Sequence, residues 1–213
     1  MMLVEKSIKE FVQEVKSDNP TPGGGSVSAL AGSLGAALSS MVGNLTIGKA
    51  KYEQIPEEKR TLLEENQIKL NQIIDDLLVI VDEDSTAFDD VMKAFKLPKE
   101  TEEEKKIRSE KIQLGYKKAL EVPLKCAKKC LETLELQIVF AEYGNVNAIT
   151  DVGVGTLLAY AGLEGALFNV TINLKSIKDE KFKEEIDREI KESLNKGKAL
   201  KEEILKVVYE RLG

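Results

Sequence analysis

The sequence predicts an all-α fold, a helical bundle in which two glycine/alanine-rich inner helices are surrounded by long charged amphipathic helices. Apolar residues recur at helical spacing along most of the 213 residues, and no alternating strand pattern of convincing length is present. Charged residues make up 32% of the chain but are absent from 19–48 and nearly absent from 143–174, and these two windows hold 12 of the 15 glycines. The length fits a single domain spanning residues 1–213.

The first elements are a short amphipathic helix between residues 4 and 15 and an inner helix within the first charge-poor window. A proline- and glycine-rich loop joins them, and the inner helix is expected to start at Gly25 or Ser26, with Ser26 as a possible N-cap. Glycine inside a helix costs about 1 kcal/mol relative to alanine, so a stripe of small residues predicts close packing against another helix. The stripe is Gly25, Ala29, Gly32, Ala36, Ser39 and Gly43.

A long amphipathic helix is predicted over 57–96, between Pro56 and Pro98. Asp84 stands on its apolar seam, where a hydrophobic residue is expected. A carboxylate on a packing face must be hydrogen-bonded, paired or exposed in a cavity, which makes Asp84 a candidate functional residue. The neighbouring Asp82 lies off the seam and is interpreted as solvated.

The next helix is predicted to open with a capping box at Thr101–Glu104 and to reach about residue 140, with Pro123 as a kink or break. Within it, only 136–141 is ambiguous between helix and strand. Cys126 and Cys130 are four residues apart. They are expected to be reduced thiols, because they cannot join distant segments and no second cysteine pair completes a zinc site.

The second charge-poor window predicts another inner helix with the same kind of small-residue stripe. Asp151, near its start, could cap free N–H groups or face a cleft. Glu164 lies in mid-helix with no lysine or arginine within ten residues, so its partner must come from another segment, another subunit or a ligand. Asn169 and Asn173 extend the stripe with amides that could join helices or contact a ligand.

A last amphipathic helix is predicted over 182–208, with Gly197 as a weak point. The N-terminus is charged at once and lacks the apolar segment of a signal peptide, which predicts a cytoplasmic protein.

Composition excludes several classes of function. The chain has no histidine, so it cannot build a Ser-His-Asp triad, a Cys-His pair or an imidazole-ligated metal site. The net charge of −6, with lysine and glutamate interleaved, argues against nucleic-acid binding. Residues 24–47 could span a membrane by length, but the run contains many Ser, Thr and Asn residues, so a buried core helix is preferred. A purely structural hairpin or dimer core would explain the glycines but not the polar residues on the same stripes.

Two polar features suggest a ligand site. Lys49 is the first charge after the neutral window, and Tyr52 follows one turn later. Lys49 would also favour the dipole at the helix end. Gly23–Ser26 could present backbone N–H groups to an anion, although the spacing fits neither a P-loop nor a dinucleotide fingerprint. The residues alone predict a polar-lined, glycine-walled cleft and do not name its substrate.

A set of short motifs runs in order over nearly the whole chain. The motifs are Pro22–Val27, Gly48–Lys49, Tyr52, Asp82–Phe88, Leu97–Lys99, Val122–Leu124, Gly144–Asn145, Asp151–Gly155 and Asn169–Asn173. Together they resemble the formiminotetrahydrofolate cyclodeaminase / methenyltetrahydrofolate cyclohydrolase family, which includes the C-terminal domain of the bifunctional formiminotransferase-cyclodeaminase. Each motif alone is weakly specific, whereas the ordered set is strong. One departure is Thr150, where the family often has serine.

The resemblance implies a cytoplasmic homodimer that acts on tetrahydrofolate derivatives in one-carbon metabolism and histidine degradation. No cofactor, metal, nucleic-acid or membrane partner is expected. The expected reaction is cyclodeamination of 5-formiminotetrahydrofolate to 5,10-methenyltetrahydrofolate with release of ammonia. The alternatives are methenyltetrahydrofolate cyclohydrolase and, from another class, a non-catalytic helical folate-binding or scaffold protein.

Carboxylates whose pKa values are tuned by burial can carry the required proton transfers in a chain without histidine. The hypothesis is that Asp151 and Asp84 line the cleft as acid–base group and electrostatic stabiliser, with Glu164 as a further candidate. Lys49 and the Gly23–Ser26 amides would hold the glutamyl carboxylates of the folate. The full set of expected substrate-binding residues is Gly23, Gly24, Gly25, Ser26, Asn44, Lys49, Tyr52, Asn145, Asn169 and Asn173, with the last three orienting the pterin.

Overall fold

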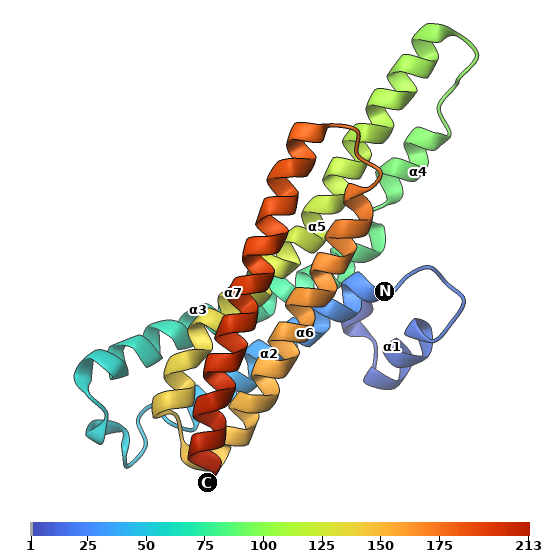
Figure 1. Cartoon of the computed structure of the whole chain (residues 1–213). Helices are drawn as coiled ribbons and strands as arrows, with labels where there is room; N and C mark the ends of the chain where they lie inside the picture. Colours follow the sequence, from blue (N-terminus) through green and yellow to red (C-terminus); the bar gives the residue numbers. More distant parts are fainter. Residues whose placement is uncertain (1) are drawn as a thin grey trace.

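A computed structural model describes residues 2–213, and within that range the regular structure is helical, with no strand. The all-α fold class is therefore confirmed, and 136–141 is helical. The helices are α1 (Ile8–Val15), α2 (Gly24–Asn44), α3 (Glu57–Thr86), α4 (Asp89–Phe95), α5 (Glu102–Tyr143), α6 (Ile149–Leu174) and α7 (Glu180–Leu212). Figure 1 shows α4 and the start of α5 extending beyond the rest of the bundle.

The centre of the bundle is the pair α2 and α6, around which α3, α5 and α7 pack. A Cβ atom on Gly35 would lie 2.6 Å from the carbonyl oxygen of Gly155, and one on Gly162 would lie 2.8 Å from that of Ser28. Only glycine permits such an approach. The contacts also show that the two helices run antiparallel, because the later residue of α2 meets the earlier residue of α6. The close packing predicted from the small-residue stripes is thus confirmed.

The single helix predicted over 57–96 is wrong, because α3 and α4 are separate helices. The Ser85 hydroxyl donates to the carbonyl oxygen of Asp82 at 2.7 Å, and such side-chain bonds compete with the main-chain ladder. The chain then turns, and the Phe88 ring meets the Tyr116 ring edge-on with centroids 6.2 Å apart. Local polar bonding and an aromatic contact therefore end α3 where the apolar pattern alone continues.

Two residues expected to weaken helices lie inside continuous ones. Pro123 is buried within α5, which continues through it because α5 packs along α2, α3, α6 and α7. Gly197 lies within α7, where a Cβ atom would come within 2.2 Å of Leu163, so this glycine lets α7 approach α6. The capping box at Thr101 is confirmed, since its hydroxyl accepts the N–H of Glu104 at 3.2 Å.

The start of α2 differs from the expectation. Gly23 is the N-cap, and Ser26 lies in the first turn. Instead of capping, the Ser26 hydroxyl donates to the carbonyl oxygen of Val81 at 2.9 Å. Cys126 and Cys130 are buried free thiols on α5.

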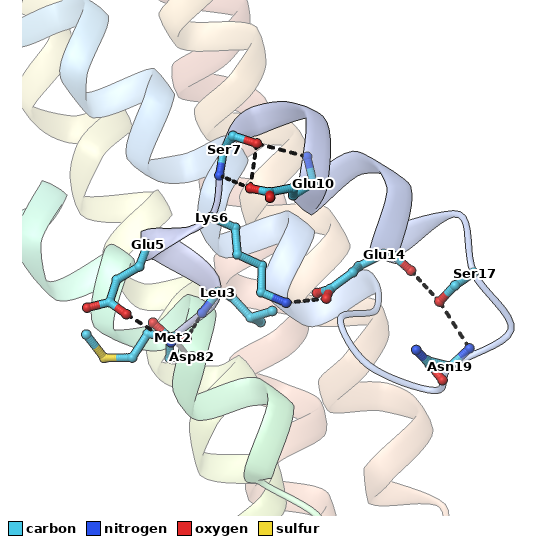
Figure 2. A network of polar contacts seen from close by, with 10 residues as sticks. All are labelled: Met2, Leu3, Glu5, Lys6, Ser7, Glu10, Glu14, Ser17, Asn19 and Asp82. Carbon is cyan, nitrogen blue, oxygen red and sulfur yellow. Dashed lines mark hydrogen bonds and ion pairs between the residues drawn. The ribbon is translucent and has the colours of Figure 1, made fainter.

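The N-terminal segment and α1 form an arm on the side of the bundle, which Figure 2 shows in detail. The Asp82 carboxylate of α3 accepts a hydrogen bond from the backbone N–H of Leu3, so Asp82 anchors the arm and is not merely solvated as predicted. In the capping box that opens α1, the Glu10 carboxylate accepts the N–H of Ser7 at 2.9 Å and the Ser7 hydroxyl accepts the N–H of Glu10.

The outer faces of α2 and α6 carry apolar side chains that the rest of the chain leaves uncovered. Leu34 is 49% exposed on α2, and Phe168 and Ile172 are 67% and 57% exposed on α6. The segments Gly24–Asn44 and Val146–Leu174 are long and apolar enough to cross a membrane, yet 61% and 50% of their apolar windows is buried inside the bundle. Burial to that degree is what helices at the core of a bundle show.

Candidate functional site

A cleft of about 550 Å³ lies at the end of the bundle where α2 and α5 stop and α6 begins. We call it the Lys49 cleft. Four separate parts of the chain line it: the segment after α2, the turn before α3, the α5–α6 connection and the end of α7. One wall is apolar and aromatic, and the polar groups include several cations. The lining includes Lys49, Lys51, Tyr52, Ile55, Glu142, Tyr143, Asn145, Val146 and Arg211.

Lys49 reaches the cleft through the turn that follows α2. Gly48 has a φ of 68°, in the left-handed region that favours glycine, and the next residue is delivered to the cleft. Lys49 is exposed and forms no ion pair within residues 2–213. Its charge therefore complements the C-terminal end of α2 and remains available to an anionic ligand.

Tyr52 lines the cleft, while its hydroxyl is bonded to α3. The hydroxyl donates to the Glu64 carboxylate at 2.7 Å. Burial first, and the hydrogen bond to Glu64 second, raise the pKa of Tyr52 to about 12. A phenol with that pKa stays protonated near neutral pH, so Tyr52 shapes the cleft and is poorly suited to proton transfer.

Asn145 ties the α5–α6 connection to the end of α2. Its backbone N–H donates to the Thr46 hydroxyl at 2.9 Å, and its side-chain amide donates to the carbonyl oxygen of Leu45 at 3.2 Å. The side-chain oxygen accepts the N–H of Asn147 at 3.0 Å. These bonds hold one rim of the cleft, and the predicted role in orienting a pterin remains a prediction.

Asp151 lies in the first turn of α6, one turn beyond Asn147 and at the same end of the bundle as the Lys49 cleft. It is half-buried, and within residues 2–213 its carboxylate has no hydrogen-bond or ion-pair partner. The N-cap of α6 is Ala148, so Asp151 does not cap the helix through its side chain. A carboxylate that the fold leaves unpaired is available for chemistry at this end.

Asp84 lies at the other end of α2, where it closes the helix N-terminus. Its Oδ2 accepts the N–H of Ser26 at 2.8 Å, and it lies 3.1 Å from the Ser26 hydroxyl, whose one hydrogen it shares with the Val81 carbonyl oxygen. Burial raises the pKa of Asp84, and the two Ser26 hydrogen bonds oppose that rise. The carboxylate thus occupies the position that the sequence interpretation gave to a glutamyl carboxylate held by the Gly23–Ser26 amides.

Neither Asp84 nor Asp151 is among the residues that line the Lys49 cleft, and within one chain the two carboxylates lie at different ends of α2. Asp84 contacts Ser26, whereas Asp151 lies one turn before Gly155, which packs against Gly35 and Leu38 of α2; the antiparallel packing places Asp151 toward the Leu38 side. At about 1.5 Å of rise per residue, Ser26 and Leu38 are about 18 Å apart along α2. The expectation that one chain brings the two carboxylates together is therefore corrected by the antiparallel packing of α2 and α6.

The amide candidates of α6 lie at the Asp84 end. Asn169 is beside Gly24, where a Cβ atom would be 3.5 Å from its Nδ2, and that nitrogen donates to the carbonyl oxygen of Gly165 at 2.9 Å. Asn173 is buried one turn further on. The substrate-binding candidates therefore divide between the two ends of the α2–α6 pair.

Two candidates, Glu164 and Asn44, belong neither to the Asp84 end nor to the lining of the Lys49 cleft. Glu164 lies one turn from Tyr160, on the side of α6 that faces α7, where the Lys201 ammonium is 4.2 Å from the centroid of the Tyr160 ring. Burial, followed by the charge of Glu164, raises the pKa of Tyr160. The side-chain oxygen of Asn44 accepts a hydrogen bond from Gln67 at 3.2 Å, so it supports the α2–α3 contact.

Arg211 lines the cleft but was not among the residues that the sequence interpretation selected. Its guanidinium donates to the carbonyl oxygens of Ala141 and Gly144, the second at 2.8 Å. Helix α7 contains many lysines, so no sequence signal distinguishes this one cation from its solvated neighbours. Only the docking of α7 against the end of α5 brings it to the cleft.

Comparison with known proteins identifies relatives over nearly the full length. The model of the formiminotransferase-cyclodeaminase family matches residues 7–192. A methenyltetrahydrofolate cyclohydrolase of Methylorubrum extorquens is 42% identical over 99% of this chain and 100% of its own. A formimidoyltransferase-cyclodeaminase of Gallus gallus is also 42% identical, over 92% of this chain and 36% of its own. A crystal structure of formiminotetrahydrofolate cyclodeaminase from Thermotoga maritima superposes with a TM-score of 0.85, at 28% identity, over 99% of this chain and 100% of that one.

Proposed function

The chain belongs to the formiminotransferase-cyclodeaminase family, and from that premise we propose that it is a folate-dependent enzyme of one-carbon metabolism. The proposed reaction is cyclodeamination of 5-formiminotetrahydrofolate to 5,10-methenyltetrahydrofolate. The observation that carries this proposal is the Lys49 cleft, where Lys49 and Tyr52 of one motif region meet Asn145, a motif residue from a distant part of the sequence. An aromatic and apolar wall beside cations suits a ligand that joins flat rings to carboxylates.

The reaction needs groups that move protons and tolerate a developing positive charge. N10 of the folate attacks the formimino carbon on N5, the N10–carbon bond forms, and the former imine nitrogen leaves as ammonia after accepting protons. Asp151 is the proposed acid–base group, because it is half-buried, unpaired and at the cleft end of α6. Its negative charge would also stabilise the cationic methenyl product. Lys49 would hold a carboxylate of the substrate.

Methenyltetrahydrofolate cyclohydrolase is the second candidate activity. It is favoured by the 42% identity to the Methylorubrum enzyme, which this chain matches over its whole length. In that reaction water adds to the methenyl carbon, and the ring opens at N5 to give 10-formyltetrahydrofolate. The same groups would serve, with the carboxylate now removing a proton from water.

Two substrates distinguish the activities. With 5-formiminotetrahydrofolate, a cyclodeaminase produces the methenyl absorbance and releases ammonia in equal amounts. With 5,10-methenyltetrahydrofolate, a cyclohydrolase removes that absorbance faster than an enzyme-free control. Catalysis of the second reaction alone would assign the cyclohydrolase. Binding of a reduced folate without turnover of either compound would leave a non-catalytic folate-binding protein, and no binding at all would contradict the folate proposal.

We further propose that the chain acts as a homodimer through the exposed faces of α2 and α6. Contiguous exposed apolar side chains mark interaction surfaces, and Leu34 and Phe168 lie on these faces. A two-fold axis perpendicular to α2 would place the Asp84 end of one chain against the Lys49 cleft of the other. The two groups of candidates, separated in one chain, would then share a site. A cytoplasmic location and a role in histidine degradation stay predictions.

Mixed dimers test the shared site. Asp84→Asn and Asp151→Asn variants are each expected to lose turnover. In a dimer with one chain of each kind, one of the two sites keeps both carboxylates. Random pairing of the two variants should therefore restore up to about half of one wild-type site per dimer on average. Recovery would need residues from both chains in one site. Light scattering of Leu34→Lys and Phe168→Lys variants should show monomers that retain their helical circular dichroism. If those variants remain dimeric, another face makes the dimer.

A further inference from the structure

The guanidinium of Arg211 sits at the point where α5 ends and the Lys49 cleft begins. It is carried by the last turn of α7, and it donates to the carbonyl oxygens of Ala141 and Gly144, the second at 2.8 Å. Gly144 directly precedes Asn145, which forms the rim of the cleft. Arg211 therefore joins the last turn of α7 to the wall of the proposed site.

Arg211 has no counter-ion among the residues that the structure describes. Within residues 2–213, no carboxylate lies within 4.0 Å of Arg211, although ion pairs are numerous elsewhere. Its side chain is half-buried, and burial lowers the pKa of the guanidinium without neutralising it near pH 7. A half-buried charge with neutral partners only is incompletely compensated. An anion bound in the cleft would supply the guanidinium with a counter-ion.

We propose that Arg211 is a binding residue of the Lys49 cleft that takes a carboxylate of the substrate. The inference rests on the proposed function, since a folate carries carboxylates on its glutamyl portion. Arginine has more N–H donors than the two used on Ala141 and Gly144, and a planar fork with free donors suits a carboxylate. Those two bonds fix the guanidinium, so little side-chain freedom remains to be lost when the anion binds.

Lys49 and Lys51 add to the positive charge of the same cleft, and Glu142 is a carboxylate in its lining. Both lysines are exposed, so the fold fixes their side chains less tightly, and salt screens their attraction to an anion more strongly. Arg211 is the cation with a fixed position. It lies beyond residue 192, where the family match ends, so the inference concerns a residue that the matched region does not contain.

The experiment compares two ligands and three variants by calorimetry. The ligands are a reduced folate and the primary amide of the corresponding reduced pteroate, which carries no carboxylate. The variants are Arg211→Gln, Arg211→Lys and the control Arg188→Gln, an exposed arginine on the same helix. Glutamine keeps neutral donors for the two carbonyls and removes the charge, and circular dichroism verifies the fold of each variant.

Arg211→Gln should weaken binding of the reduced folate about tenfold or more, as expected for losing a charge-assisted hydrogen bond. It should change binding of the pteroate amide less than about twofold, Arg211→Lys should fall between, and Arg188→Gln should match the wild type. Equal losses for both ligands would show that Arg211 only caps α5, and no loss would show that it is not used; either result overturns the inference. Wild-type protein that binds the folate no better than the pteroate amide overturns it without any variant. If the wild type binds neither ligand, the proposed function fails together with it.

Discussion

The Asp84 carboxylate accepts the backbone N–H of Ser26 at 2.8 Å and so closes the N-terminus of α2. A residue that looks misplaced on the apolar seam of α3 therefore has a partner 58 positions earlier in the chain. The contact joins α3 to α2 and places a negative charge where the helix dipole favours one. It explains why a glycine must precede Ser26 and why the pH dependence of stability should carry a signature of Asp84.

Gly25→Ala should destabilise the fold strongly. A Cβ atom at Gly25 would lie 2.0 Å from Oδ1 of Asp84, so either the carboxylate or the helix must move, at a cost of about 1–3 kcal/mol. The matched control is Gly24→Ala, whose Cβ atom would meet only the Asn169 amide at 3.5 Å. Urea unfolding should place this control within about 1 kcal/mol of the wild type. Equal stability of the two variants would contradict the contact.

Asp84 should make the folded state less stable as the pH rises. Burial raises its pKa above the ordinary value of 3.8, so the folded chain keeps a proton that the unfolded chain has released. The free energy of unfolding of the wild type, relative to Asp84→Asn, should fall from pH 3.8 up to the raised folded-state pKa and then level off. Urea titrations between about pH 3 and pH 7 measure this difference.

The control for that experiment is Asp76, whose pKa is lowered by its hydrogen bond to Lys129. The sign is opposite here, because the pair stabilises the folded state above 3.8 and that stability is lost as the pH falls through the lowered pKa. The wild type should therefore gain stability relative to Asp76→Asn as the pH rises. The same slope for both aspartates would contradict the assigned environments.

Tyr52→Phe should reduce stability by about 1–2 kcal/mol, because it removes a part-buried hydrogen bond to the Glu64 carboxylate. Turnover should stay within about threefold of the wild type, since a phenol with a pKa of about 12 does not transfer protons near neutral pH. Tyr209→Phe, at a side chain that is 70% exposed, serves as the stability control. Loss of turnover with unchanged stability would instead make the Tyr52 hydroxyl a catalytic group.

Asp151→Asn should lower kcat by about 100-fold or more, as expected when a group that transfers protons is neutralised. The measurement is steady-state turnover of 5-formiminotetrahydrofolate, with Asp187→Asn, an exposed aspartate on α7, as the control. Unfolding midpoints should be similar for both variants, because the Asp151 side chain has no partner within residues 2–213 to lose. A folded Asp151→Asn protein with full turnover would remove Asp151 from the catalytic group.

Most of the fold could be predicted because its signals are local. Apolar periodicity located the charged helices, Thr101 marked the start of α5, and the stripes of small residues predicted the close approach of α2 and α6. The errors arose where a distant contact overrides a local signal. Gly197 lies in a continuous helix because α7 packs against Leu163. Asp82 accepts the N–H of Leu3, and no residue near Asp82 in the sequence indicates that partner.

The absence of histidine, the two charge-poor windows and the ordered motifs were readable from the sequence, and they determined the fold class, the family and the set of candidate residues. Only the tertiary structure decided how those candidates are grouped. Spacing along a chain does not reveal that α2 and α6 run antiparallel, and it is this packing that sends Asp84 to one end of the bundle and Asp151 to the other. Arg211 depends on tertiary structure even more, because its place at the cleft follows from the docking of α7 against α5.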